Sequence, residues 1–220
     1  IDKWKEFTME KSTIIEYVLN YNKNTLFIDT DNILLNKLDL NIPYNYDLGL
    51  SPHNINKLQT DKYGIFNAGF MFFSNKDILN KWKTYTQKSR FYEQASLEDL
   101  NNDKDLNTFH FNITYNYGWW TFFQSTIPDK DKIKYFNIDK YNGDILYDYK
   151  TLKTIHTHMG IPYNDYQNNK FNEIIIDLLK KSPKSEYKLL LQFIQNNNNN
   201  SSSIYNIYIP KQPRQNAFYN

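Results

Sequence analysis

Apolar residues recur along the chain at two spacings, and these predict an alternation of helices and strands. Over residues 2–20 the apolar positions follow the period of a helix, with Lys11 as the polar exception among them. This pattern predicts an amphipathic helix that packs on a sheet. Residues 25–28 form a short apolar run after the turn-like Asn22-Lys23-Asn24, which predicts a buried strand.

The rest of the chain shows the same alternation. We expect further strands where short apolar runs occur, over residues 46–51, 65–73, 133–138 and 153–156. We expect helices where helical spacing returns, over residues 76–89, 93–100, 171–181 and 186–195. Two segments are ambiguous: a loop or short helix over residues 34–39, and an irregular or stranded aromatic segment over residues 109–123. Strands that alternate with helices predict an α/β fold with a mixed sheet.

The end of the chain differs in composition from the rest. Residues 196–203 consist only of Asn and Ser, which predicts a flexible linker. Residues 204–220 show the Tyr/Ile alternation of an edge strand, although disorder fits them equally well. We therefore expect one domain over residues 1–195 and a linker with a tail over residues 196–220. Because the chain begins at Ile1 rather than Met, without a signal-peptide pattern, we expect a fragment or a processed product.

Composition and charge exclude several classes of function. The chain has 26 Lys and Arg against 24 Asp and Glu, which argues against nucleic acid or a polybasic membrane surface as the main partner. It has no Cys, so it forms no disulfide or thiolate metal site. No apolar run approaches the about 18 residues of a transmembrane helix. Together these features favour a cytoplasmic location. Aromatic residues make up 17% of the chain, which suits stacking on sugars but also core packing or an AT-rich coding bias.

Two carboxylates follow the first predicted strand, in Asp29-Thr30-Asp31. Residues two apart in an extended chain point to the same side, so both side chains are expected to project together from the strand's carboxyl end. Two hard oxygen ligands there suit Mg²⁺ or Mn²⁺. Solvated loop carboxylates are the alternative interpretation, because Asp-x-Asp also arises often by chance.

Three later motifs add candidate chemistry. In Asn67-Ala68-Gly69, a polar residue beside a small one interrupts an apolar run, which indicates a close backbone approach to another group. The pair Glu93-Gln94 lies at the start of a predicted helix, where a solvated helix face is the plainer interpretation. The third motif, His156-Thr157-His158, ends a predicted strand. Its two rings could point in the same direction and bind a metal, or they could have a purely structural role.

The order of these motifs resembles the GT-A nucleotide-sugar glycosyltransferases, nearest their glycogenin-like retaining branch. The resemblance covers about residues 10–160, and Phe66-Asn67-Ala68-Gly69 is its most specific piece. It implies a GT-A-like, mixed and mostly parallel sheet flanked by helices. Only about 25 residues precede the Asp-x-Asp strand, so part of the family's N-terminal nucleotide-binding unit is expected to be missing.

The resemblance also implies a role for each motif. Asp29 and Asp31 match the residues that hold Mn²⁺, or Mg²⁺, on the nucleotide diphosphate. Asp29 is also expected to bind the substrate. His156 best matches the family's late metal-ligating His, and His158 is the alternative because it lies closer to Gly160. The remaining matches concern the sugar: Asn67, Ala68 and Gly69 lie against the donor sugar, and Glu93 and Gln94 lie near its anomeric carbon.

The expected function is therefore that of a Mn²⁺-dependent hexosyltransferase. It would move a sugar from a nucleotide-diphosphate donor, UDP-linked by preference, to a hydroxyl group of a glycan or protein. A non-catalytic module that binds sugar or nucleotide with the same fold is the first alternative. The second is an unrelated Mg²⁺-dependent phosphohydrolase with Asp29 as nucleophile, in which the Asn67-Ala68-Gly69 run would have no role.

Overall fold

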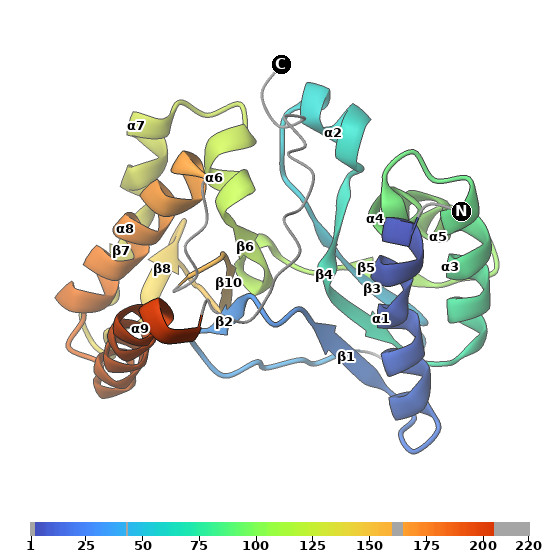
Figure 1. Ribbon diagram of the computed structural model, residues 1–220, viewed down its shortest axis with the longest axis horizontal. Coiled ribbons are helices and arrows are strands. Elements are labelled where there is room, and N and C mark those ends of the chain that lie inside the picture. Colours follow the sequence, from blue (N-terminus) through green and yellow to red (C-terminus); the bar gives the residue numbers. More distant parts are fainter. Residues whose placement is uncertain (1–2, 43, 160–164, 205–220) are drawn as a thin grey trace.

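The computed structural model describes residues 3–42, 44–159 and 165–204. Within these residues the protein is an α/β molecule with mixed sheets flanked by helices, as Figure 1 shows. None of the described helices has the length and apolar character needed to span a bilayer. The tail over residues 205–220, for which the sequence suggests an edge strand or disorder, lies outside the described residues.

The first sheet has four strands in the order β1-β4-β3-β5. They are β1 (Thr25–Ile28), β4 (Phe66–Phe73), β3 (Leu48–Pro52) and β5 (Thr108–His110). The central strand β4 runs antiparallel to both β1 and β3, whereas β3 and β5 are parallel. All eight residues of β4 are buried, which explains why its sequence is an almost unbroken apolar run.

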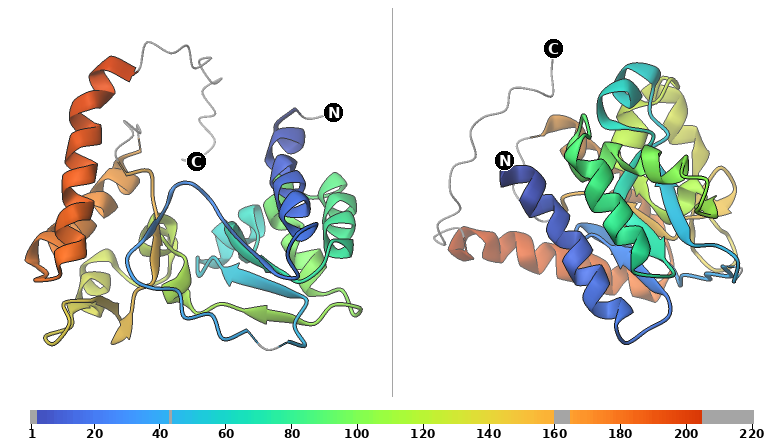
Figure 2. Two further views of the ribbon diagram at one scale, coloured as in Figure 1. Left: turned by 90° about the horizontal axis from the view of Figure 1, so that it is seen from below. Right: turned by 90° about the vertical axis from the view of Figure 1, so that its right-hand side faces the viewer.

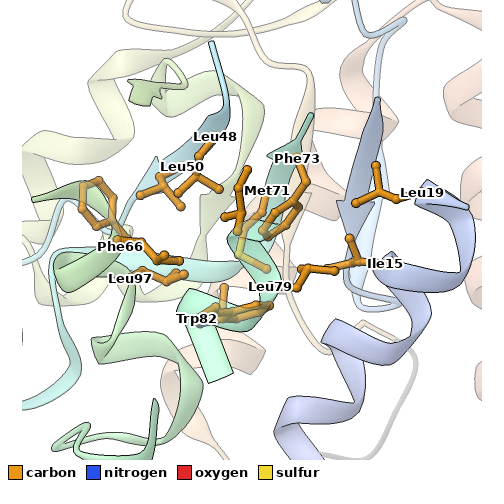
Figure 3. Packing of buried hydrophobic residues seen from close by; sticks show 13 residues of the cluster. Ile15, Leu19, Leu48, Leu50, Phe66, Met71, Phe73, Leu79, Trp82 and Leu97 are labelled. Atoms are coloured by element: carbon orange, nitrogen blue, oxygen red, sulfur yellow. The ribbon is translucent and has the colours of Figure 1, made fainter. Parts of the chain in front are cut away.

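Helices cover one face of this sheet: α1 (Lys3–Leu19), α3 (Asp77–Gln87), α4 (Tyr92–Ala95) and α5 (Leu97–Asn101). Met71 and Phe73 of β4 pack there with Ile15 of α1 and Trp82 of α3, as Figure 3 shows. The short helix α2 (Lys57–Tyr63) connects β3 to β4. On the opposite face, Phe70 packs with aromatic residues near β5 and with the loop that follows β2.

Within the residues that the structure describes, the other half of the molecule contains two small sheets and four helices. One sheet has the order β2-β10-β6, formed by β2 (Asn32–Leu34), β10 (Thr154–His156) and β6 (Tyr117–Gly118). The other is antiparallel and contains β7 (Phe136–Ile138), β8 (Ile145–Tyr147) and β9 (Lys150–Thr151). The helices are α6 (Trp119–Gln124), α7 (Asp129–Lys132), α8 (Tyr166–Lys181) and α9 (Ser185–Ile204), and short 3₁₀ turns occupy η1 (Ile113–Tyr115) and η2 (Ile133–Tyr135). A second apolar core lies among these elements, and α9 lies at the opposite end of the molecule from α1 (Figure 2).

Most predicted elements are present with small shifts at their ends, but the expectation of a mostly parallel sheet is wrong. Among the described residues, five strand pairings are antiparallel and two are parallel. An apolar run indicates that a strand is buried on both faces, but it does not give the strand's direction. The direction follows from the connections, since β4 returns through α2 to lie beside β3.

Four local predictions also need correction. The helix expected over residues 93–100 is divided at Ser96 into α4 and α5. The strand expected over residues 133–138 begins with the 3₁₀ turn η2. The ambiguous segment over residues 109–123 contains the helix α6, which was not predicted. Residues 196–203, which were expected to form a flexible linker, are instead helical and belong to α9, which ends at Ile204. Extending a formed helix costs far less than nucleating one.

Candidate functional site

The two carboxylates lie where the chain crosses from the first sheet to the second. The Asp29 backbone N–H donates to the carbonyl of Gly69 (2.9 Å), which fixes the end of β1 against β4. Two residues later, the Asp31 carbonyl accepts from the backbone N–H of Thr157 (3.0 Å), which ties the crossing to the end of β10. These two backbone contacts bring motifs that are far apart in the sequence to one place.

Asp29, Asp31 and His156 form a group of convergent ligand atoms. One ligand atom from each lies within 4.8 Å of the others. His156 Nε2 is 2.8 Å from Asp31 Oδ1, and His158 Nδ1 is 3.4 Å from the other oxygen of that carboxylate. Both predicted histidines therefore contact Asp31, and His156 is the one that joins the three-residue group.

Two asparagines and a tryptophan hold the His156 ring. Its Nδ1 lies 3.1 Å from the amide nitrogen of Asn32 and 3.1 Å from the amide oxygen of Asn116. Either neutral tautomer of the ring therefore finds a hydrogen-bond partner on that side. The Trp120 ring packs edge-on against it at 4.7 Å between centroids. Such contacts orient an imidazole so that its other nitrogen faces the carboxylates.

Gly69 allows the close approach that its sequence context predicts. A Cβ at this position would lie 2.3 Å from His156 Cε1 and 2.9 Å from Asp29 Oδ2, well inside contact distance. The Gly69 N–H donates to the side-chain oxygen of Asn67 (2.8 Å), which also accepts from the Asn116 amide (2.9 Å). The Asn67 side chain therefore binds both the backbone of β4 and the Asn116 side chain that contacts His156.

Lys11 is a site residue that sequence reasoning did not select. Its Nζ lies 2.9 Å from Asp29 Oδ2 and 3.3 Å from Glu93 Oε1. Burial lowers the pKa of Lys11, but the charges of Asp29 and Glu93 outweigh this and raise it above its usual value. The available signal was its position as the polar exception on the apolar side of the first helix.

The predicted pair Glu93-Gln94 faces two directions. The buried Glu93 carboxylate points to Lys11. The Gln94 side chain accepts at Oε1 from the amide of Asn67 (3.2 Å) and donates from Nε2 to the carbonyl of Tyr63 (3.1 Å). The Ala68 backbone N–H also points to Gln94 Oε1, at 3.5 Å. Gln94 therefore belongs with the Asn67-Ala68-Gly69 segment, and Glu93 belongs with the carboxylate cluster.

Two pockets open beside the cluster, and His158 lines both. The larger has a volume of about 560 Å³ and lies between Asp31, the end of β10 and apolar residues of α9. The smaller, of about 190 Å³, lies between Asn67, Gln94 and the tryptophans of α6. Asp31 itself lines the larger pocket, and His158, which contacts Asp31, lines both.

Two carboxylate oxygens and an imidazole nitrogen, all within 4.8 Å, are a donor set that fits a divalent cation. A scan against models of known protein families finds no match for the chain, and a search of curated proteins finds none either.

We predict an acid-dependent contribution of Asp31 to the stability of the metal-free protein. Burial raises the pKa of Asp31, but the hydrogen bond and charge of His156, with the charge of His158, lower it to about 2. Because this folded-state pKa lies below the unfolded value, the stabilisation is present above about pH 4 and is lost as the pH falls toward 2. The difference in unfolding free energy between the wild type and Asp31→Asn should therefore shrink by about 2 kcal/mol over that range. Chemical denaturation at several pH values measures it, and a constant difference would contradict the assignment.

We also predict that Lys11→Met lowers metal-free stability and strengthens Mn²⁺ binding. The change leaves Asp29 and Glu93 without their shared cation, which should cost about 2 kcal/mol for a mostly buried pair. It also removes a positive charge beside the proposed cation, so Mn²⁺ affinity should rise several-fold. Denaturation and calorimetric titration with Mn²⁺ measure the two effects. Lys57→Met removes a solvent-exposed ion pair with Asp61 and should change neither. Weaker Mn²⁺ binding by Lys11→Met would refute the prediction.

Proposed function

We propose that the chain is a metal-dependent glycosyltransferase with a GT-A-like fold. It would transfer a hexose from a nucleotide-diphosphate sugar, preferably UDP-linked, to a hydroxyl group of a glycan or protein. The main support is the convergence of Asp29, Asp31 and His156 beside the bare backbone of Gly69. These residues belong to three of the four motifs on which the resemblance to the family rests, and Glu93-Gln94 is the fourth.

In this proposal Asp29, Asp31 and His156 hold Mn²⁺ or Mg²⁺. When bound, the cation supplies Lewis-acid stabilisation of the negative charge that grows on the departing diphosphate. Mn²⁺ suits an imidazole ligand better than Mg²⁺ does, because Mg²⁺ prefers oxygen ligands alone. His158 stays beside Asp31 and lines both pockets.

The other residues would bind and orient the substrates. The Asn67 amide donates to Gln94, and Gln94 in turn donates to the Tyr63 carbonyl, so both side chains are held in place and can position a sugar with little loss of side-chain freedom. Gln94 lines the smaller pocket and is the better placed of the predicted catalytic pair to contact a sugar. Glu93 acts through Lys11, which it holds beside Asp29. Lys11 provides a fixed positive charge near the proposed position of the diphosphate.

A screen of nucleotide sugars without metal, with Mn²⁺ and with Mg²⁺ tests the proposal. We expect nucleotide release and sugar transfer from at least one UDP-sugar, dependent on the metal and abolished by EDTA. We also expect UDP with Mn²⁺ to raise the melting temperature more than either alone. If no nucleotide sugar is bound or turned over with either metal, the proposal is wrong.

A non-catalytic binding module is the second candidate, because both carboxylates have positively charged or hydrogen-bonding partners within the chain. Lys11 pairs with Asp29, and His156 pairs with Asp31. Such internal pairs can stabilise the fold without a metal. This candidate would be favoured if UDP and Mn²⁺ stabilise the protein but no sugar is transferred to any glycan or protein acceptor.

A further inference from the structure

The smaller pocket beside the cluster has aromatic walls. Its volume is about 190 Å³, and its rings come from three separate elements: Tyr63 at the end of α2, Phe91 before α4, and Trp119 and Trp120 on α6. Phe91 packs edge-on against Tyr63 at 4.8 Å between centroids, and Trp120 packs edge-on against His53 at 5.6 Å. The rings therefore support one another and keep the walls in place.

The polar groups of this pocket are amides, imidazoles, the Tyr63 hydroxyl and the indole N–H groups of its tryptophans. Its lining includes no Lys, Arg, Asp or Glu among the described residues. Burial lowers the pKa of His53 to about 4, even though its hydrogen bond to the Gly64 carbonyl raises it, so this ring is uncharged near neutral pH. A neutral His53 donates from Nδ1 to that carbonyl (2.9 Å) and keeps Nε2 as an acceptor, 3.4 Å from the Asn67 amide.

Two glutamines have hydrogen-bonding capacity left for a ligand. Gln94 uses one N–H of its amide on the Tyr63 carbonyl, which leaves the second. The side-chain amide of Gln124, on α6, has no partner among the described residues, while its backbone carbonyl is fixed by the N–H of Asn56. Donors and acceptors for a ligand are thus available from two elements, α4 and α6.

We propose that this pocket binds an uncharged pyranose ring, and that Gln124 is one of the residues that recognise its hydroxyl groups. Aromatic walls suit the apolar faces of a sugar, and a few fixed polar groups suit its hydroxyls. A uronic acid or a sugar phosphate would leave its charge without a partner in this lining, which disfavours both. This inference rests on the proposed function in one respect, because it treats the pocket as part of the proposed glycosyltransferase site. The ring could belong to the donor or to the acceptor, and the experiment distinguishes the two.

Saturation-transfer NMR with neutral methyl hexopyranosides and with methyl glucuronide tests the proposal on the full chain, with and without UDP and Mn²⁺. We expect at least one neutral glycoside to bind and the glucuronide not to bind. Gln124→Ala should weaken that binding about fivefold, the effect of one lost neutral hydrogen bond. The control is Gln192→Ala, the same change at an exposed position on α9, and it should bind like the wild type. Gln124→Lys should weaken binding of the neutral glycoside and strengthen binding of the glucuronide.

The outcomes separate this proposal from the proposed function. Binding of a neutral glycoside that requires Gln124 supports the pocket even if no nucleotide sugar is turned over. If the bound glycoside is displaced by a UDP-sugar, the pocket holds the donor's sugar; if both bind together, it holds the acceptor's. The proposal is overturned if no neutral glycoside binds under either condition, if the glucuronide binds equally well, or if Gln124→Ala and Gln192→Ala behave alike.

Discussion

Asp31→Asn should abolish both Mn²⁺-dependent stabilisation and sugar transfer while leaving the chain folded. Asp31 contributes one of three convergent ligand atoms and contacts both histidines of the site. Removing an outer contact of a metal site typically costs 10- to 100-fold in affinity, so loss of a direct ligand should exceed about 100-fold. The fold should survive because Asn has the same size and can still accept a hydrogen bond from His156.

Three measurements on purified protein check this prediction. Circular dichroism tests the fold, calorimetric titration tests Mn²⁺ affinity, and nucleotide release from a UDP-sugar tests turnover. Asp61→Asn is the matched control, because Asp61 pairs with Lys57 on the exposed side of α2 and should change none of the three. An Asp31→Asn protein that retains wild-type affinity and activity would remove the metal centre from the proposal.

The sequence predicted the part of the site that depends on local spacing. Asp29 and Asp31 follow a short apolar strand, and their side chains do converge. Gly69 interrupts an apolar run, and its backbone does lie against another group, the His156 ring. Both signals lie within a few residues, but the carboxylates do not converge for the expected reason. Asp29-Thr30-Asp31 is a turn between β1 and β2, closed by the Asn32 N–H on the Asp29 carbonyl (3.0 Å), rather than extended chain. The absence of a side chain at Gly69 is a local property.

The parts that the sequence did not predict depend on contacts between distant segments. In the sequence, Lys11 is only a polar residue on the apolar side of a helix. The fold shows that it forms ion pairs with Asp29 and Glu93. Asn116 lies in a segment with no regular pattern, yet it supports both Asn67 and His156. An asparagine in a sequence suggests a turn or a cap, and its tertiary hydrogen bonds leave no local pattern.

Local preference was also overridden by packing in the aromatic segment. The run Trp119-Trp120-Thr121-Phe122-Phe123 consists of residues typical of strands, but it forms the helix α6. Phe122 is buried there in the second apolar core, next to Phe136 and Phe171, and this packing selects the helix. The same helix brings Trp120 and Gln124 to the smaller pocket. The sugar-binding proposal thus depends on an element that the sequence alone did not indicate.

Gly69→Ala should destabilise the protein and disrupt the metal centre together, although it adds only a methyl group. The added carbon would lie 2.3 Å from His156 Cε1, so either the ring or the strand must move. Neither moves easily, because His156 is buried between Asn32, Asn116 and Trp120 and β4 is paired on both sides. Overpacking of this kind costs about 1–3 kcal/mol. The cost comes from the lack of space, since the Gly69 φ lies outside the left-handed region.

A double-mutant cycle with His156→Ala separates this steric effect from a general weakening of β4. In the metal-free protein, Gly69→Ala alone should lower the unfolding free energy by about 2 kcal/mol. In the His156→Ala background the ring is gone, so the same change should cost at least about 1 kcal/mol less. Mn²⁺ affinity of the single variant Gly69→Ala should also fall at least about tenfold, because the displaced ring no longer faces Asp31. Equal costs in the two backgrounds would show that Gly69 does not make room for His156, and unchanged Mn²⁺ affinity would show that the ring's position does not matter for the metal.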